Sequence, residues 1–175
     1  LNKKAAVIVN AMDFVTDIEQ RKASVQKEIG ALNGLGFQPE ELDLRNYSGK
    51  PELLAQKLSE FGLLWVRGGN VFTLRKAYKV SGMDMWLISH RDDTDLVYAG
   101  YSAGVCVLSP SLRGLELVDN PGEDTIWDGL GLIDFAFAPQ YQSDHPESEA
   151  INKVVEYYKT NNIPYKALRD GEVII

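Results

Sequence analysis

Five residues in the middle of the chain, Gly100-Tyr101-Ser102-Ala103-Gly104, follow the pattern G-x-S-x-G. This pattern is typical of a nucleophile elbow, in which a serine occupies a strained turn between a strand and a helix. The glycines let such a turn approach neighbouring backbone, and the first amides of the following helix could stabilise an oxyanion. Ser102 is therefore a candidate nucleophile. The alternative is a glycine-rich turn whose serine caps the helix.

A second glycine-rich segment, Gly68-Gly69-Asn70, also follows an apolar run and precedes a helical pattern. Paired glycines allow a backbone N–H to face the crevice, where it could be a second oxyanion donor. The alternative is a turn in which Asn70 is the N-cap of the next helix. The patterns of phosphate loops and dinucleotide folds, G-x-x-x-x-G-K-[ST] and G-x-G-x-x-G, are absent, so nothing in the sequence supports a nucleotide function.

A serine nucleophile needs a general base, and the sequence holds two histidines. His90 lies at a predicted helix end before three charged residues, which favours a solvated capping role. His145 follows the strand that is predicted to end at Pro139, the correct edge of a sheet for a base, although a helix-entry role fits it equally well. Glu116 and Asp119, in the loop after the elbow helix, are the acidic candidates to orient a base.

The elements that must position these residues alternate along the chain. Short apolar runs, typical of strands that are covered on both faces, predict strands at residues 5–9, 41–44, 63–66, 96–99 and 135–138. Longer amphipathic segments predict helices at residues 17–35, 51–62, 71–80, 83–90 and 148–160. The apolar positions of the first helix are Ile18, Val25, Ile29 and Leu32, and residues 165–168 lead into a predicted terminal hairpin at Asp170-Gly171.

This alternation predicts a three-layer α/β/α fold with a mostly parallel sheet. In such sheets the ligand binds at the carboxyl ends of the strands. Ser102, Gly69 and His145 all follow predicted strand ends, so we expect them at the same edge of the sheet.

Composition excludes several classes of function. The chain has 175 residues, of which 45% are hydrophobic and 25% are charged, and a net charge of −7. An acidic chain without a basic stripe argues against nucleic acids and anionic membranes as partners. No apolar run approaches the roughly 20 residues of a membrane span. One cysteine, Cys106, cannot form an internal disulfide, so a reducing, cytoplasmic setting is expected. The histidines and Cys106 lack metal-ligand spacing, and neither a metal nor a cofactor is predicted.

Two motifs together carry a family resemblance: Trp65-Val66-Arg67-Gly68-Gly69-Asn70-Val71-Phe72 and Tyr98-Ala99-Gly100-Tyr101-Ser102-Ala103-Gly104. They resemble the peptidase E, or aspartyl dipeptidase, family of serine peptidases, over residues 5–172. The resemblance implies the flavodoxin-like, class I glutamine amidotransferase-like fold in a single domain over residues 1–175. It also implies Ser102 as nucleophile, Gly69 and Ala103 as oxyanion donors, and short peptides as substrates, including those with an N-terminal aspartate.

One position departs from the family pattern. The family's base is a histidine directly after a proline at the end of a strand, and here Gln140 follows Pro139. Glutamine cannot accept and return a proton near neutral pH, so it cannot activate Ser102. Three explanations stay open: His145 replaces the base, the natural protein has lost its activity, or the sequence carries a deliberate inactivating change. The rival function is a silent protein that binds a peptide or another small molecule.

Other site residues are assigned less directly. The resemblance places Glu116 near the acidic triad member, with Asp119 as the alternative because this loop aligns loosely. Arg67 and Arg113 lie near the two motifs and are predicted to bind a substrate carboxylate, with Asn70 beside them.

The chain ends suggest further expectations. The sequence begins at Leu1 rather than Met and stops within Val173-Ile174-Ile175, an apolar run typical of a strand. The family carries additional strands on both sides, so both ends are expected to have been trimmed. Unpaired sheet edges would then favour edge-to-edge association into a homodimer. A cysteine nucleophile is a poor third hypothesis, because the elbow holds Ser102 and Cys106 lies a turn later.

Overall fold

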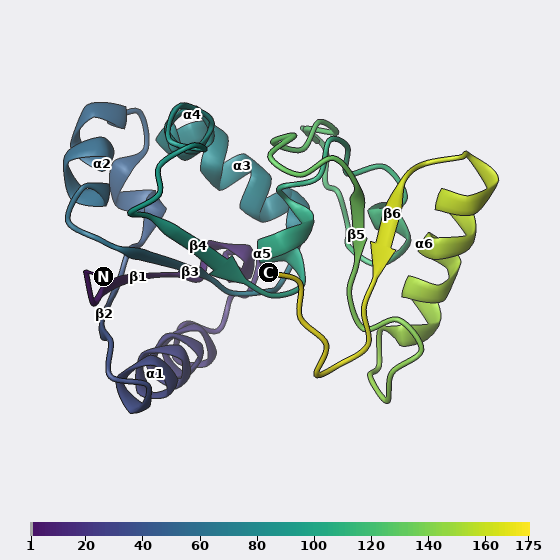
Figure 1. Ribbon diagram of the computed structural model, residues 1–175, viewed down its shortest axis with the longest axis horizontal. Helices are drawn as coiled ribbons and strands as arrows, with labels where there is room; N and C mark the ends of the chain where they lie inside the picture. The colour runs from purple at the N-terminus through teal and green to yellow at the C-terminus, as the bar shows by residue number, and fades with distance from the viewer. Residues whose placement is uncertain (1) are drawn as a thin grey trace.

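The computed structural model describes residues 2–175 and has a four-stranded parallel sheet at its centre (Figure 1). The strand order is β2-β1-β3-β4. The strands are β1 (Lys4–Ile8), β2 (Gln38–Glu41), β3 (Leu63–Val66) and β4 (Val97–Gly100). The side chains of residues 5–9 are fully buried because β1 has a strand on each side and helices over both faces.

Helices cover both faces of this sheet (Figure 1). The helices around it are α1 (Ile18–Gly34), α2 (Pro51–Leu58), α3 (Val71–Ser81), α4 (Met83–Ser89) and α5 (Ala103–Cys106), whereas α6 (Ser148–Thr160) lies beside a second sheet. On one face, Val25 of α1 packs in a cluster with Ala5 and Val7. On the opposite face, α2, α3 and α4 pack over Ile8 and Leu64. The predicted α/β fold with a mostly parallel sheet is therefore confirmed.

A second, two-stranded sheet lies beyond α5 (Figure 1). Its strands, β5 (Ala136–Ala138) and β6 (Tyr165–Ala167), are parallel and are connected through α6. Ile151 and Tyr158 of α6 belong to the same hydrophobic cluster as Leu64, so the two sheets share one core. The expected fifth strand is present, but it pairs with β6 in a separate sheet. No helix within residues 2–175 is both long enough and apolar enough to cross a membrane.

The strand predicted at residues 41–44 is present as β2 but lies three residues earlier, so its predicted bounds are wrong. β2 ends at Glu41, and a 3₁₀ helix, η2 (Leu44–Tyr47), follows. The Asn10 side chain accepts the N–H of Leu44 at 3.1 Å and donates to Asp43 at 3.1 Å. These side-chain bonds replace the strand ladder and turn the chain away from the sheet.

The predicted terminal hairpin is also wrong. Asp170 and Gly171 form a turn, but residues 173–175 are exposed and form no strand. β6 finds its partner in β5, in parallel register, rather than in the residues that follow the turn.

The buried face of α1 differs from the predicted apolar stripe. Ile18 is 67% exposed, whereas two charged residues of α1, Arg21 and Glu28, are buried. Arg21 lies 3.2 Å from the carboxylate of Asp13 and 2.7 Å from that of Glu41. Charged groups are buried only where they are paired, so polar partners at the sheet set the rotation of this helix.

Candidate active site

Ser102 occupies a strained turn between β4 and α5. Its backbone angles are φ 51° and ψ −124°, in the left-handed half of dihedral space that residues other than glycine rarely adopt. The Ser102 side chain makes no capping hydrogen bond to the helix. The alternative of a helix-capping serine is therefore wrong, and a capping role does not account for the strained backbone of Ser102.

The glycines on either side of Ser102 allow the turn to lie against β3. A Cβ atom added to Gly100 or to Gly104 would collide with the carbonyl oxygen of Val66. That oxygen is part of the backbone and cannot move aside. The Tyr98 hydroxyl donates to the carbonyl of Gly104 at 2.6 Å, which ties α5 to β4. Close approach between backbones therefore explains both glycines of the pattern.

The Gly68-Gly69 segment lies directly against this turn. A Cβ atom on Gly68 would lie 2.8 Å from the Cβ of Ser102 and 3.1 Å from the ring of Tyr101. Gly69 has φ 150°, and a Cβ there would lie 2.5 Å from the carbonyl oxygen of Ala11. The structure thus brings together the two glycine motifs and the loop after β1.

Two backbone donors at this edge are free. Neither the N–H of Gly69 nor that of Ala103 donates to another group within residues 2–175. Both belong to segments that contact Ser102, so both are available to an acceptor bound beside its hydroxyl.

Asn70 holds the start of α3. Its Oδ1 accepts the N–H of Thr73 at 2.9 Å, and its Nδ2 donates to the carbonyl of Asn120 at 2.9 Å. The residue is 8% exposed. The N-cap role that was the alternative for this segment is therefore present, and the side-chain amide directs its hydrogen bonds into the protein.

The two acidic candidates occupy different places. Glu116 is exposed on a 3₁₀ helix, η3 (Leu115–Leu117), and accepts the N–H of Gly114 at 2.6 Å. Asp119 reaches the glycine-rich loop instead, where its Oδ2 accepts the N–H of Val71 at 2.8 Å. Burial raises the pKa of Asp119 to about 6, against the opposing hydrogen bond from Val71, and the charge of Glu147 adds to the rise.

The candidate bases lie on the loop between β5 and α6. Gln140 has φ 53°, and its side-chain oxygen is buried without a hydrogen-bond partner in the described part of the chain. The Nδ1 of His145 accepts the N–H of Glu147 at 3.2 Å, which is the helix-entry role. No hydrogen bond joins Ser102 to either residue within residues 2–175.

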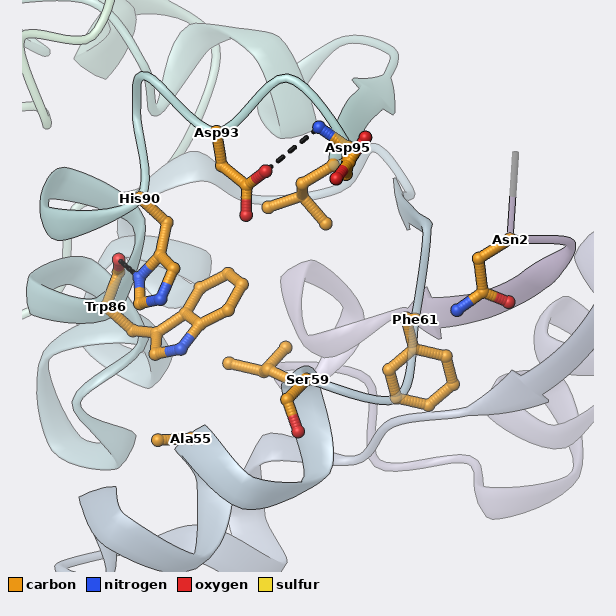
Figure 2. Close-up of a pocket in the computed structure, with 10 residues that line it drawn as sticks. Asn2, Ala55, Ser59, Phe61, Trp86, His90, Asp93 and Asp95 are labelled. Atoms are coloured by element: carbon orange, nitrogen blue, oxygen red, sulfur yellow. Dashed lines mark hydrogen bonds between the residues drawn. The ribbon is translucent and has the colours of Figure 1, made fainter.

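His90 lies at the opposite edge of the sheet. Its ring stacks on Trp86 with centroids 4.2 Å apart, and its Nδ1 bonds to the Trp86 carbonyl at 2.8 Å. Figure 2 shows both rings lining a cavity of about 410 Å³, with Phe61, Asp93 and Asp95 on its other sides. Phe61 and Asp95 precede β3 and β4, so this cavity is at the amino ends of the strands and Ser102 is not among its lining residues.

The two arginines are placed differently. Arg113 is exposed, and its guanidinium lies 4.9 Å from the ring centroid of Trp127. Arg67 is mostly buried: its Nη1 donates to the carbonyl of Gly68 at 2.7 Å, and its Nε lies 3.6 Å from Glu28. The charge of Arg67 is therefore already paired.

Sequence reasoning missed Glu28. Its carboxylate is 8% exposed and accepts from the Tyr101 hydroxyl and from the Trp65 Nε1, each at 2.8 Å. Burial raises the pKa of Tyr101, and its bond to Glu28 raises it further. The available signal was spacing, because Glu28 falls between Val25 and Leu32 on the buried face of α1.

Comparison with known proteins identifies relatives of this chain. An "uncharacterized peptidase Lin0382" of Listeria innocua serovar 6a (strain ATCC BAA-680 / CLIP 11262) is 30% identical over 148 residues, which are 83% of this chain and 68% of that protein. A 1.5 Å crystal structure of a candidate peptidase E protein from Listeria monocytogenes EGD-e matches with a TM-score of 0.72 and 27% identity, and covers 98% of this chain and 84% of its own.

The structural match agrees with the expected flavodoxin-like fold. The model of peptidase family S51 matches residues 13–175, a range that includes the Gly68-Gly69 segment and the Ser102 turn. The chain therefore belongs to peptidase family S51.

Proposed function

We propose that this protein is a serine peptidase that hydrolyses short peptides, with Ser102 as its nucleophile. The observation that carries the proposal is the strained Ser102 backbone, whose side chain makes no capping bond to the helix and whose Cβ lies close to Gly68. Ser102 Oγ would attack the carbonyl carbon of the peptide bond. The N–H groups of Gly69 and Ala103 would donate to the oxygen that becomes negative. The peptidase names of the relatives support a peptide as substrate.

Asp119 is the acidic residue that this proposal favours. It is anchored on Val71, directly after the glycine-rich loop, whereas Glu116 is exposed and bonded to its own turn. An acid that orients a base must itself be held in place, and the Val71 N–H supplies that restraint.

The missing element is a base. The proton of Ser102 Oγ must pass to a base and then to the leaving amine, and Gln140 cannot carry it. The second candidate function is therefore an inactive homologue that binds peptides. The specific observation that favours it is Gln140 itself, at the family's histidine position, with a buried side-chain oxygen that has no hydrogen-bond partner within residues 2–175.

One comparison separates these functions. Hydrolysis of an Asp-Leu dipeptide and labelling by a fluorophosphonate are measured for the chain, for Gln140→His and for His145→Ala, with Ser102→Ala as the matched blank. We expect activity and Ser102 labelling to appear, or to rise by at least about 100-fold, in Gln140→His. Equal activity with and without the change, lost in His145→Ala, would assign the base to His145. No labelling in any form would leave the binding function.

Arg113 is the arginine whose guanidinium is exposed for a substrate carboxylate. In the form that is active, we expect Arg113→Ala to raise KM for an Asp-Leu dipeptide by about 10-fold and to change kcat little, because the interaction is made equally in the ground state and the transition state. Ala-Leu is the matched control substrate. An unchanged KM for Asp-Leu would remove this assignment.

A further inference from the structure

We infer that a cluster of Glu28, Arg67 and Tyr101, built around the buried carboxylate of Glu28, orients both the oxyanion donor and the nucleophile of the site. We call it the Glu28 cluster. Its first arm is the contact from Glu28 through Arg67 to Gly68, and its second arm is the contact from Glu28 to Tyr101. The inference rests on the proposed function, and it assigns these three side chains as positioning residues rather than as groups that touch substrate.

The arm through Arg67 sets the direction of one donor. Arg67 Nη1 donates to the carbonyl oxygen of Gly68 at 2.7 Å. A trans peptide bond is planar, so the carbonyl of Gly68 and the N–H of Gly69 point in opposite directions. Holding that oxygen therefore aims the Gly69 N–H away from Arg67. Two glycines leave this peptide free to rotate, so an external restraint is needed.

The arm through Tyr101 holds the turn at the nucleophile. Tyr101 immediately precedes Ser102, and its hydroxyl donates to Glu28 at 2.8 Å. Its ring also packs on Trp65, with centroids 6.1 Å apart. A φ of 51° at a serine persists only where the surroundings hold it, and Tyr101 links that turn to α1.

Glu28 joins the two arms. Its side chain is 8% exposed and contacts Tyr101, Trp65 and, at 3.6 Å, Arg67. A carboxylate buried to this degree is stable only with such partners. The Tyr101 phenol is protonated at neutral pH, as tyrosines ordinarily are, and burial and the bond to Glu28 raise its pKa further, so its hydroxyl is the donor to Glu28. The guanidinium of Arg67 is mostly buried because it lies beside the Glu28 carboxylate.

The test uses two pairs of variants. Arg67→Met breaks the first arm, and Arg75→Met is its control, because Arg75 is also buried, lies 3.0 Å from Asp84 and donates to the carbonyl of Asp128 at 2.9 Å. Tyr101→Phe breaks the second arm by removing one hydroxyl. Ser81→Ala is its control, because it likewise removes one hydroxyl, which donates to the carbonyl of Ala77 at 2.8 Å on α3, away from the cluster.

The first readout does not need activity. In ¹⁵N-glycine spectra, we expect the Gly69 amide signal to move in Arg67→Met and to stay in place in Arg75→Met. A Gly69 signal that is unmoved by Arg67→Met, or that moves equally in both variants, overturns the Arg67 arm. Because this holds whether or not Ser102 reacts, failure of the inference is distinguishable from failure of the proposed function.

The second readout is the saturating rate of Ser102 labelling by a fluorophosphonate, in the chain or in Gln140→His, whichever labels. We expect a fall of about 10-fold or more in Arg67→Met and Tyr101→Phe, and less than about 2-fold in the two controls, with unchanged probe affinity. A fall that simply follows the melting temperature across all four variants would mean a structural role only and would overturn the inference.

Discussion

Among single residues, the glycines around Ser102 have no room for a side chain, because backbone atoms of β3 or the side chains of Ser102 and Tyr101 lie too close. Gly68 has Ser102 and Tyr101 within 3.2 Å of a Cβ position, and Gly100 and Gly104 face the Val66 carbonyl. The sequence predicts glycine at these positions because both glycine motifs include them. Glu28 and Asp119 carry no such motif, since their importance comes from partners far along the chain.

Gly68→Ala tests this tight contact. The added methyl group would lie 2.8 Å from the Cβ of Ser102, so we expect the free energy of unfolding to fall by about 1–3 kcal/mol. Gly30→Ala is the control, because its Cβ on α1 has nothing within 4 Å. A helical glycine replaced by alanine should gain about 0.5–1 kcal/mol. Urea unfolding measures both, and a neutral Gly68→Ala would contradict the packing described.

Asp119 predicts a specific pH dependence of stability. Its pKa of about 6 in the folded chain exceeds the ordinary value near 4 of an unfolded aspartate. The folded state therefore binds this proton more tightly, so the stabilising contribution is complete below pH 4 and is lost as the pH rises through 6. Asp119→Asn keeps an acceptor for the Val71 N–H but cannot ionise.

We expect Asp119→Asn to match the parent chain at pH 4 and to exceed it in unfolding free energy by about 1–2 kcal/mol above pH 7. Urea unfolding at pH 4, 5, 6 and 7 measures this difference, and subtraction of the parent curve removes the contributions of other groups. A constant difference across this range would show that the folded pKa is ordinary.

Among elements, α3 illustrates how much of the site depends on a helix start. Asn70 caps the helix, donates to Asn120 and thereby ties the loop containing Asp119 to the glycine-rich segment. This cap is one of the two alternatives that the sequence leaves for the segment, because Asn is a strong N-cap residue and the bond is local. The sequence could not predict the contact with Asn120, which lies 50 residues away.

Asn70→Ala should therefore cost more than the loss of a simple cap. We expect about 2 kcal/mol in the free energy of unfolding, because both the cap and the bond to Asn120 are lost. Asp17→Ala is the matched control, since the Asp17 carboxylate accepts the backbone N–H groups of Glu19 and Gln20 at the start of α1 and has no long-range hydrogen-bond partner within residues 2–175. Its expected cost is about 1 kcal/mol. Equal costs would show that the bond to Asn120 contributes nothing.

For the molecule as a whole, Cys106 lies between the two sheets, because α5 follows β4 of the first sheet and packs on β5 of the second. This thiol is 3% exposed on α5 and lies 3.5 Å from the carbonyl of Phe137 on β5. Burial raises the pKa of Cys106, so it is a protonated and unreactive thiol in the folded chain. It is not placed to act as a nucleophile at the Ser102 turn.

Reaction of Cys106 with an aromatic disulfide reagent therefore reports opening of the two sheets. At pH 8 we expect the folded chain to react at least about 1,000-fold more slowly than the chain in urea. Cys106 is the single cysteine, so no other thiol contributes. A rate in the folded chain that rises with urea, but less steeply than global unfolding requires, would indicate that β5, β6 and α6 open separately. Rapid reaction without urea would contradict the burial.

The residues alone establish most of the element types, the parallel sheet and the two glycine motifs at its carboxyl edge, because hydrophobic period, capping and turn geometry are local. The tertiary structure decides which side chains meet there. Gly68 packs on Ser102, Asp119 rather than Glu116 reaches the glycine-rich loop, and Glu28 joins Arg67 to Tyr101. These contacts join residues that are distant in sequence, so they depend on how helices rotate and loops close, which no local pattern encodes.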